Sequence, residues 1–579
     1  MTMLNVVTEG PEKSQDQTNS DFHLAVAELA EAVGEDHVST DDADMERYSA
    51  TIIPWERKCS AVVFPGSTEE IQKIVEIATK YRLPLWPFGR GKNWGYGTTT
   101  AVHDGAIVVM MERMNRIIEV NEELAYAVVE PGVTQRQLDD YLKENNIQLW
   151  SDCTDGPSDG SVVGNALERG IGETPYGDHF EKVCGMEVVL PDGSLVRTGA
   201  AHFSKSKTCN VFKWGVGPYF EGLFSQSNYG IVTKMGIWLM PKPQAFNSYV
   251  FELRREEDMP IMIDKIRRLS LQGAIQSKVH IINDFIGLAL VGKYPHHLLN
   301  GESCLSQETK AQLRKRYNIA PWSFGGGIYG SPAQLRAHRA LIKKELSPYG
   351  KLMFVTDQKI SLLKRLVSFL KKARSSSRFA GLVNRLTVRL IGKPYEYLEA
   401  FPHIHSLLQG VPSDYFVGHC YFKTKMERPR TNIDPARDRC GLMWAGIVVP
   451  STGKEMNELL DLVKPLFEKH RFDFSTALML ANPRSIIALM SIFFDREDAE
   501  ETARAMTLYN EMCETTAAAG YQQYRTTVAY MDRIMQHSPT FAAMANKIKQ
   551  ALDPHNIFAP GRYGIGQVGA CDTSSCSGV

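Results

Sequence analysis

A glycine-rich segment at residues 87–97, PFGRGKNWGYG, has the composition of a loop that holds a phosphorylated ligand. It carries four glycines in eleven residues and follows a strand-like run, so its successive backbone N–H groups can turn toward a pyrophosphate. It is not a Walker loop, because Gly91 and Lys92 are followed by Asn93, and no helix signal follows it as in a Rossmann fingerprint. The same composition also suits a tight surface loop without a ligand. Taken alone, the segment leaves both interpretations open.

A second segment of small residues, DCTDGPSDGSVVGNALERGIG at 152–172, favours the first interpretation. Both segments lie beside strand-like runs. Two separated loops of this kind suit a long diphosphate cofactor better than a mononucleotide.

Six segments, in a single order along the chain, resemble the vanillyl-alcohol oxidase and p-cresol methylhydroxylase family of FAD-linked oxidases. The resemblance runs from near residue 50 to residue 565 and so covers nearly the whole chain. Glycine loops are individually weak signals, whereas TPYGDH, FSQSNYGIVTKMGIWLMP and APGRYG are specific in combination. The six segments are GRGKNWGYG (89–97), VVEPGVT (128–134), GSVVGNALERGIGETPYGDH (160–179), GLFSQSNYGIVTKMGIWLMPKP (222–243), YQQYRT (521–526) and DPHNIFAPGRYGI (553–565).

The resemblance implies an FAD cofactor and assigns residues to it. The 87–97 loop would hold the pyrophosphate through backbone N–H groups, and Arg562 would approach flavin N1 and O2, where negative charge develops on reduction. The other implied residues are Phe88, Gly89, Arg90, Gly91, Lys92 and Asn93 at the pyrophosphate, Glu130, Pro131, Gly132, Gly230, Ile231 and Val232 at the adenine and ribose, and Ser161, Gly164, Asn165, Glu168 and Arg169 along the diphosphate and ring.

The same resemblance implies a phenol site built from Tyr96, Tyr524 and Arg525. Two hydroxyl donors and a guanidinium around one oxygen would stabilise a phenolate and lower the pKa of the phenol. The phenolate would push electrons through the ring, so that hydride leaves the benzylic carbon for flavin N5 and a quinone methide results. Water addition, proton loss and loss of a side-chain carboxylate are all open as its fate. Without the surrounding motif, Tyr524 and Arg525 would be interpreted as covering a helix end.

Asp155 is the carboxylate expected near flavin N5. The loop that carries it is one residue longer than the family pattern, so Asp152 and Asp159 compete for the role. Asp155 is preferred because the extra residue fits best within 157–159.

The sequence departs from the family at the point of flavin attachment. Gly441 stands where vanillyl-alcohol oxidase has the histidine that links FAD, and Ser485 and Ile486 replace its paired cap histidines. The usual covalent bond is therefore expected to be absent. Cys153 occupies the place of the cysteine that bonds flavin C6 in berberine-bridge-type enzymes, with an ordinary buried cysteine as the alternative.

The elements that must position these residues alternate between strand and helix, which predicts an α+β fold. Periodicity and turn residues predict helices over 68–82, opened by Thr68, and over 134–146, and a hairpin with an Asp-Gly turn over 186–199. The resemblance divides the chain into a two-part FAD-binding domain of the vanillyl-alcohol oxidase type, residues 1–244 and 510–579, and a cap domain, residues 245–509, with an antiparallel sheet flanked by helices.

The overall composition restricts the kinds of binding partner that the sequence predicts. The net charge of −1 gives no sign of a nucleic-acid partner, and no apolar run is long enough to span a membrane. The first twenty residues lack the layout of a signal peptide, so a cytoplasmic location is expected. The ten cysteines form no CxxC pair and are expected to be thiols. The histidine pairs at 296–297 and 403/405 lack further ligands at metal spacing, so no metal site is expected.

Phenol oxidation is the leading hypothesis, with a para-substituted phenol as substrate and dioxygen or an electron-transfer protein as acceptor. A flavin-dependent 2-hydroxy-acid dehydrogenase is the first alternative, although it would need metal-binding histidines. A catalytically inactive flavoprotein is the second, and the retained Tyr96, Tyr524, Arg525 and Asp155 weigh against it. The resemblance also implies a homodimer or a larger assembly.

Overall fold

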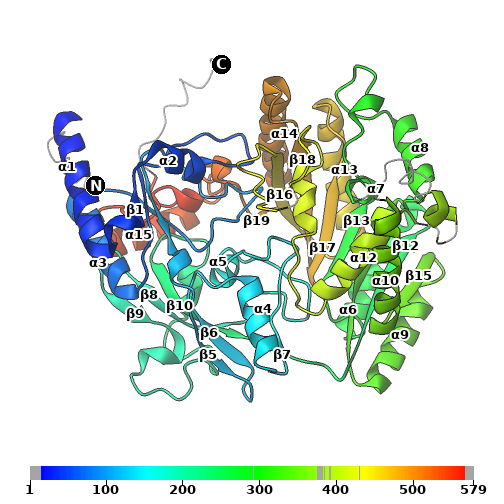
Figure 1. Cartoon of the computed structure of the whole chain (residues 1–579), viewed down its shortest axis with the longest axis horizontal. Helices are drawn as coiled ribbons and strands as arrows, with labels where there is room; N and C mark the ends of the chain where they lie inside the picture. The colour runs from blue at the N-terminus through cyan, green and yellow to red at the C-terminus, as the bar shows by residue number, and fades with distance from the viewer. Residues whose placement is uncertain are drawn as a thin grey trace.

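The computed structural model describes residues 15–567 except 291, 375–382, 384, 390, 392 and 430. Its elements form two groups that meet along one long boundary, with the blue, cyan and red parts of the chain on one side and the green to orange parts on the other (Figure 1). The eight cysteines in the described part of the chain are free thiols, as predicted, whereas Cys571 and Cys576 lie outside it. Within the described residues no helix is long and apolar enough to cross a membrane.

The first sheet places the loop at 87–97 directly after a buried strand. Its order is β1 (Val38–Ser39), β2 (Ala61–Val63), β4 (Ile107–Met110) and β3 (Leu85–Phe88), and both β2 and β3 run parallel to β4. Helix α3 (Thr68–Tyr81) confirms the predicted helix and packs four apolar residues onto this sheet. The cap is Ser67 rather than Thr68, because the Ser67 side chain accepts from the backbone N–H of Glu70. Helices α1 (Gln15–Val33) and α2 (Asp42–Ser49) lie beside the same strands.

The second sheet carries the other predicted cofactor segments. Its order is β5 (Ile117–Asn121), β6 (Tyr126–Val129), β10 (Ile231–Trp238), β8 (Val183–Val189) and β9 (Leu195–Arg197). The β8–β9 hairpin turns at Asp192 and Gly193, and Gly193 has a φ of +80°, so the predicted hairpin is confirmed. Helix α4 (Gln135–Glu144), capped by Thr134, is likewise confirmed. The segment interpreted as a glycine loop at 152–172 contains one short helix, α5 (Val162–Leu167).

The third sheet has eight strands, all antiparallel to their neighbours, which confirms the antiparallel sheet expected after residue 245. Helices α6, α9, α13 and α14 cover one of its faces with apolar side chains. In sheet order the strands are β15 (Gly350–Val355), β12 (Ala245–Leu253), β14 (Trp322–Gly330), β13 (Val279–Asn283), β17 (Thr476–Asn482), β18 (Ser485–Phe494), β16 (Gly441–Pro450) and β19 (Gln523–Arg525). The helices around them are α6 (Met259–Leu271), α7 (Asp284–Ala289), α8 (Gln307–Tyr317), α9 (Pro332–Leu346), α10 (Asp357–Arg374), α12 (Tyr395–Leu407), α13 (Gly453–Lys469) and α14 (Ala499–Ala518).

The chain crosses twice between the two groups of elements. Strand β12, the first of the eight-stranded sheet, begins at Ala245, and the proposed boundary at 509/510 falls inside α14. After β19 the chain returns through α15 (Pro539–Leu552), the red helix among the blue and cyan elements in Figure 1. Residues 557–559 then bond the outer edge of β3, where Leu85 donates its N–H to Ile557 O and accepts one from Ala559.

Candidate active site

One cavity lies where the three sheets meet, and it encloses about 2240 Å³ of space free of protein atoms, including its opening. Its wall draws on residues from Trp86 to Arg562, contributed by both groups of elements. Large concave sites between packed layers are the usual location of cofactor and substrate sites. This cavity is the candidate active site.

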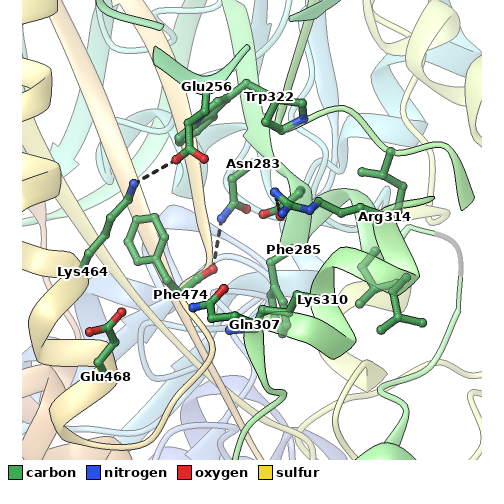
Figure 2. A pocket seen from close by; sticks show the side chains of 15 residues that line it. Glu256, Asn283, Phe285, Gln307, Lys310, Arg314, Trp322, Lys464, Glu468 and Phe474 are labelled. Carbon is green, nitrogen blue, oxygen red and sulfur yellow. Dashed lines mark hydrogen bonds and ion pairs between the residues drawn. The ribbon is translucent and has the colours of Figure 1, made fainter. Parts of the chain in front are cut away.

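A second cavity lies on the flank of the eight-stranded sheet, between α8 and α13 (Figure 2). Three cations line it, and each has a carboxylate partner: Lys464 with Glu256 at 3.1 Å, Arg314 with Asp284 at 3.2 Å and Lys310 with Asp473 at 2.9 Å. Because these charges already satisfy one another, the second cavity offers no comparable binding chemistry.

Three predicted cofactor segments are joined at the end of the main cavity near β3. Ser161, which caps α5, donates its hydroxyl to Pro131 O at 2.6 Å and accepts from Gly164 N at 2.8 Å. A Cβ atom at Gly89 would lie 2.5 Å from the Ser161 hydroxyl, so only glycine allows this approach. The 87–97 loop, the 128–134 turn and the start of α5 therefore form one cradle of backbone around the cavity.

Most residues assigned to the cofactor line this cavity. Four do not: Glu130, Gly132, Cys153 and Arg169. Glu130 is buried and bonds the backbone and guanidinium of Arg116, Gly132 packs against Met111 O, and Arg169 donates to the Ser225 hydroxyl at 2.8 Å. The assigned residues that do line it are Phe88, Gly89, Arg90, Gly91, Lys92, Asn93, Pro131, Ser161, Gly164, Asn165, Glu168, Gly230, Ile231, Val232 and Arg562.

The cavity wall also holds buried hydrogen-bond donors without partners. These donors indicate whether a diphosphate cofactor fits the cavity. The Nε atoms of Arg90 and Arg562 are buried and have no hydrogen-bond partner among the described residues. Burial also lowers the pKa of Arg562, because its charge has lost water. Unpaired buried donors are costly unless a ligand satisfies them. A ligand with two phosphates and an electron-accepting ring supplies the missing acceptors, so these residues fit FAD.

Tyr96, Tyr524 and Arg525 meet on the wall of the same cavity. The Arg525 guanidinium lies over the Tyr96 ring, 4.4 Å from its centroid, and donates to Asn93 Oδ1. Tyr96 is buried, and its pKa is raised well above 10 by burial and by Tyr524, although Arg525 opposes the shift. Tyr96 therefore remains a protonated donor.

Strand β19 positions Tyr524 and Arg525, so they do not cover a helix end. Arg525 pairs with Gly446 of β16, and a Cβ at Gly446 would lie 2.4 Å from the Tyr524 ring. Gln226 fixes the strand from the other group of elements, donating to Tyr524 O at 2.9 Å. The space left by Gly446 therefore brings the Tyr524 ring to the cavity.

Glu168 links the phenol residues to the predicted flavin residue. Its carboxylate pairs with Arg562, accepts from the Tyr563 hydroxyl at 2.6 Å and lies 3.7 Å from Arg525 Nε. The single negative charge of Glu168 thus faces the two positive charges of Arg525 and Arg562, so this end of the cavity carries a net positive charge.

Of the three competing aspartates, only Asp155 lines the cavity. Asp152 is buried against His179 at 2.6 Å and also accepts from the Thr174 backbone at 2.7 Å. Asp159 is half-exposed and pairs with the Lys92 ammonium at 3.4 Å. The position of Asp155 on the cavity wall therefore agrees with the preference for this residue.

None of the positions that correspond to flavin-attachment sites of related enzymes offers a nucleophile to the cavity. Gly441 begins β16, and a Cβ there would lie 2.3 Å from Phe494 O, so the site has no room for a side chain. Ser485 begins β18, and neither it nor Ile486 is among the lining residues. Cys153 is fully buried, and burial together with Asp152 and Glu173 raises its pKa well above 9, which opposes a thiolate.

Sequence reasoning missed the part of the wall that comes from the eight-stranded sheet. Strand pairing puts His280 opposite Met479 and Met479 opposite Ile487, so all three face the cavity from adjacent strands. The segment VHIIN shows only strand alternation, and nothing in it marks His280. Further lining residues from this side are Phe416, Val417, His419, Cys420, Trp444, Ala477 and Leu489.

Comparison with known proteins places the site in context. Residues 59–199 match the family model "FAD binding domain", and residues 455–563 match "FAD linked oxidases, C-terminal domain". The chain is 36% identical to 1'-carboxy-chondrochloren decarboxylase of Chondromyces crocatus over 93% of this chain and 96% of that protein. It is 30% identical to the flavoprotein subunit of hydroxylating 4-cresol dehydrogenase of Pseudomonas putida, over 95% and 96% of the two chains. The structure of p-cresol methylhydroxylase with substrate bound superposes with a TM-score of 0.81 at 29% identity, covering 94% of this chain and 97% of that one.

Proposed function

The chain belongs to the vanillyl-alcohol oxidase and p-cresol methylhydroxylase family of FAD-linked oxidases, and on that premise we propose that it oxidises the benzylic carbon of a para-substituted phenol. The predicted fold, the FAD cofactor and an oxidoreductase activity are confirmed by the same comparisons. The identity of the substrate and the roles of the individual residues belong to the proposal.

The observation that carries the proposal is the convergence of Tyr96, Tyr524 and Arg525 on one buried wall. A phenol oxygen placed there would accept from two hydroxyl groups beside a fixed positive charge. Such an environment favours the phenolate over the neutral phenol. Glu168 neutralises only part of the charge of Arg525 and Arg562, so the site still attracts an anionic oxygen.

When bound, FAD supplies a hydride acceptor at N5. The residues of this chain prepare the substrate for that transfer. Arg525 and the two tyrosines hold the phenolate, whose electrons move through the ring as hydride leaves the benzylic carbon. The apolar side chains of Met479, Ile487 and Leu489 exclude water from the ring.

We further propose a two-part FAD-binding domain formed by residues 1–244 and the segment after β19. The cap then runs from residue 245 through β19 (Gln523–Arg525) rather than ending at 509, because α14 and β19 pack with the eight-stranded sheet. Both the FAD-binding part and the cap contribute residues to the cavity wall, which supports this division. The electron acceptor is dioxygen or an electron-transfer protein, and both choices leave the proposed reductive step unchanged.

The experiment that tests the function compares a 4-hydroxyphenyl compound with its 4-methoxy analogue. Anaerobic mixing with purified enzyme should bleach the flavin with the phenol and not with the ether, because the ether cannot ionise. Loss of the ionisable group also leaves buried donors unpaired, which gives discrimination on the order of 10⁴-fold in comparable sites. Equal bleaching by both compounds would instead favour the 2-hydroxy-acid alternative.

A further inference from the structure

The end of the cavity away from the phenol residues is built around His280. This histidine projects from β13, and strands β17, β18 and β16 separate β13 from β19, which carries Tyr524 and Arg525. At ~4.8 Å per strand the backbones of β13 and β19 are at most roughly 19 Å apart. One side chain from each strand, with a para-substituted phenol between them, spans such a distance. His280 therefore faces the para side chain of the proposed substrate.

This end of the cavity carries little charge. Among the described residues that line it, Asp155 is the one side chain with a formal charge, and the others are histidines, a cysteine or apolar groups. The Asp155 carboxylate would repel a substrate side chain that ends in a carboxylate. Arg428, whose charge lowers the pKa of His419, does not line the cavity and donates to the carbonyls of Tyr415 and Asp414. An uncharged alkyl side chain meets no such penalty.

His280 has a carboxyl partner of its own. Its Nε2 lies 3.2 Å from Oε2 of Glu173, a residue that is 7% exposed. This distance is within ion-pair range, although the atoms are not aligned as a hydrogen bond. The turn that carries Glu173 is held by Asp152, whose Oδ1 accepts from the Glu173 backbone at 3.3 Å and from Thr174 at 2.7 Å. His179 in turn fixes Asp152. The pair is thus supported by a buried network that ends at the cavity.

The electrostatics of the pair suit a proton acceptor. Burial raises the pKa of Glu173 well above 4.5 and lowers the pKa of His280, so burial favours the neutral form of each group. The charges of Asp155 and Asp152 raise the pKa of His280, and so they stabilise its protonated form once a proton arrives. His419 differs, because burial and Arg428 lower its pKa to about 4 and Asp155 offsets them only in part.

We propose that His280, supported by Glu173, accepts the proton of a water molecule that adds to the oxidised substrate, so that an uncharged alkyl side chain yields a benzylic alcohol. The inference rests on the proposed function. After loss of hydride to FAD, the water oxygen bonds to the benzylic carbon and the exocyclic C=C pair returns through the ring to the phenol oxygen. The water proton passes to His280, and the phenolate remains at Arg525. His280 is thus a catalytic residue and Glu173 a positioning residue.

The test separates oxidation from hydration in the FAD-loaded enzyme. With 4-ethylphenol under anaerobic conditions, flavin bleaching reports oxidation, and the ratio of 1-(4-hydroxyphenyl)ethanol to 4-vinylphenol reports hydration. We expect the alcohol-to-alkene ratio of His280→Gln to fall about a hundredfold, the usual scale of general-base assistance. The ratio is set after the oxidation step, so it reports hydration whatever the bleaching rate of the variant. His403→Gln is the matched control. This histidine is outside the cavity wall, bonded to Ser413 and stacked on Tyr415, and its replacement should change neither readout.

Variants of Glu173 test the positioning role. Glu173→Leu should lower the alcohol-to-alkene ratio as far as His280→Gln does, whereas Glu173→Gln keeps a polar side chain of the same shape beside His280 and should restore most of the ratio. If His280→Gln loses flavin, the two Glu173 variants still test the proposal. Equal alcohol-to-alkene ratios in Glu173→Leu and Glu173→Gln would overturn it. An unchanged ratio in flavin-loaded His280→Gln also overturns it.

The substrate charge is tested with 3-(4-hydroxyphenyl)propionate. Wild-type enzyme should bleach more slowly with this acid than with 4-ethylphenol, and faster bleaching with release of carbon dioxide would overturn the assignment of an uncharged side chain. Failure of every phenol to bleach wild-type flavin is a separate result, because it rejects the proposed function rather than the role of His280.

Discussion

The hydroxyl groups of Tyr96 and Tyr524 lie 3.5 Å apart, although 428 positions separate the two residues in the chain. The first comes from the loop after β3 and the second from β19 in the eight-stranded sheet. A substrate oxygen that contacts both hydroxyls must therefore lie on the boundary between the two groups of elements. The relative placement of those groups sets the geometry of phenolate binding.

Removing the proposed phenolate contacts should impair chemistry more than folding. Tyr524→Phe and Arg525→Ala each remove a charge-assisted contact worth roughly 1.5–3 kcal/mol, or about ten- to a hundredfold in the rate of flavin reduction. The flavin content should stay near that of the wild type. Stopped-flow absorbance under anaerobic conditions measures the rate, and normal reduction in Arg525→Ala would remove the basis for a phenol substrate.

The three aspartates of the 152–159 loop should respond differently to alanine substitution. Asp155→Ala should slow flavin reduction about tenfold or more, because it removes the carboxylate that faces the cavity. Asp159→Ala should leave both rate and stability close to wild type, since its ion pair is partly exposed and screened by solvent.

Asp152→Ala should act on stability. It leaves His179 and two backbone N–H groups without their buried acceptor, at a cost of about 1–3 kcal/mol in the free energy of unfolding for each buried group left unsatisfied. Denaturant unfolding of the three variants side by side distinguishes these effects. A destabilised Asp155→Ala with a stable Asp152→Ala would reverse the assignment.

Acid denaturation should release the flavin from the protein. The space at Gly441 admits no linking side chain, and Cys153 is buried as a thiol away from the cavity wall. Precipitation with acid followed by absorbance of the supernatant measures the free flavin. If flavin stays with the wild-type pellet but leaves that of Cys153→Ser, the cysteine forms a bond that its position argues against.

Acid should destabilise the protein partly through His419. Its pKa in the folded protein is about 4, below the ordinary value of 6.5 for an unfolded chain. Between these values the unfolded state binds a proton that the folded state does not, so the free energy of unfolding falls as the pH drops from 6.5 to 4. The slope from this one residue is at most about 1.4 kcal/mol per pH unit. His419→Gln should flatten the dependence over this range, and parallel curves for wild type and variant would contradict the shift.

Local signals in the sequence predicted local structure well. The apolar spacing of 68–82 gave α3 directly, and only the cap moved by one residue, because Ser67 and Thr68 are both able to cap. Helix α5 was missed because its VVGNAL is short and sits among glycines. Glu130 was placed at the cofactor by its motif, whereas the fold turns its carboxylate toward Arg116.

The parts of the site that depend on pairing between distant strands could not be predicted from the sequence. The three residues of β19 carry no strand signal, and they join the eight-stranded sheet through Gly446, far away in the sequence. His280 reaches the cavity because it pairs with Met479. Periodicity reports which face of a strand is buried, but it does not report which distant strand lies beside it.

The contact between 557–559 and the outer edge of β3 also bears on biosynthesis. That edge stays uncovered in the nascent polypeptide until a segment some 470 residues further along emerges from the ribosome. At ~5–20 residues per second, the delay is on the order of 25–95 s. An open strand edge exposed for that long invites pairing between neighbouring nascent chains. Heterologous production should therefore benefit from chaperones that hold unfinished β-structure.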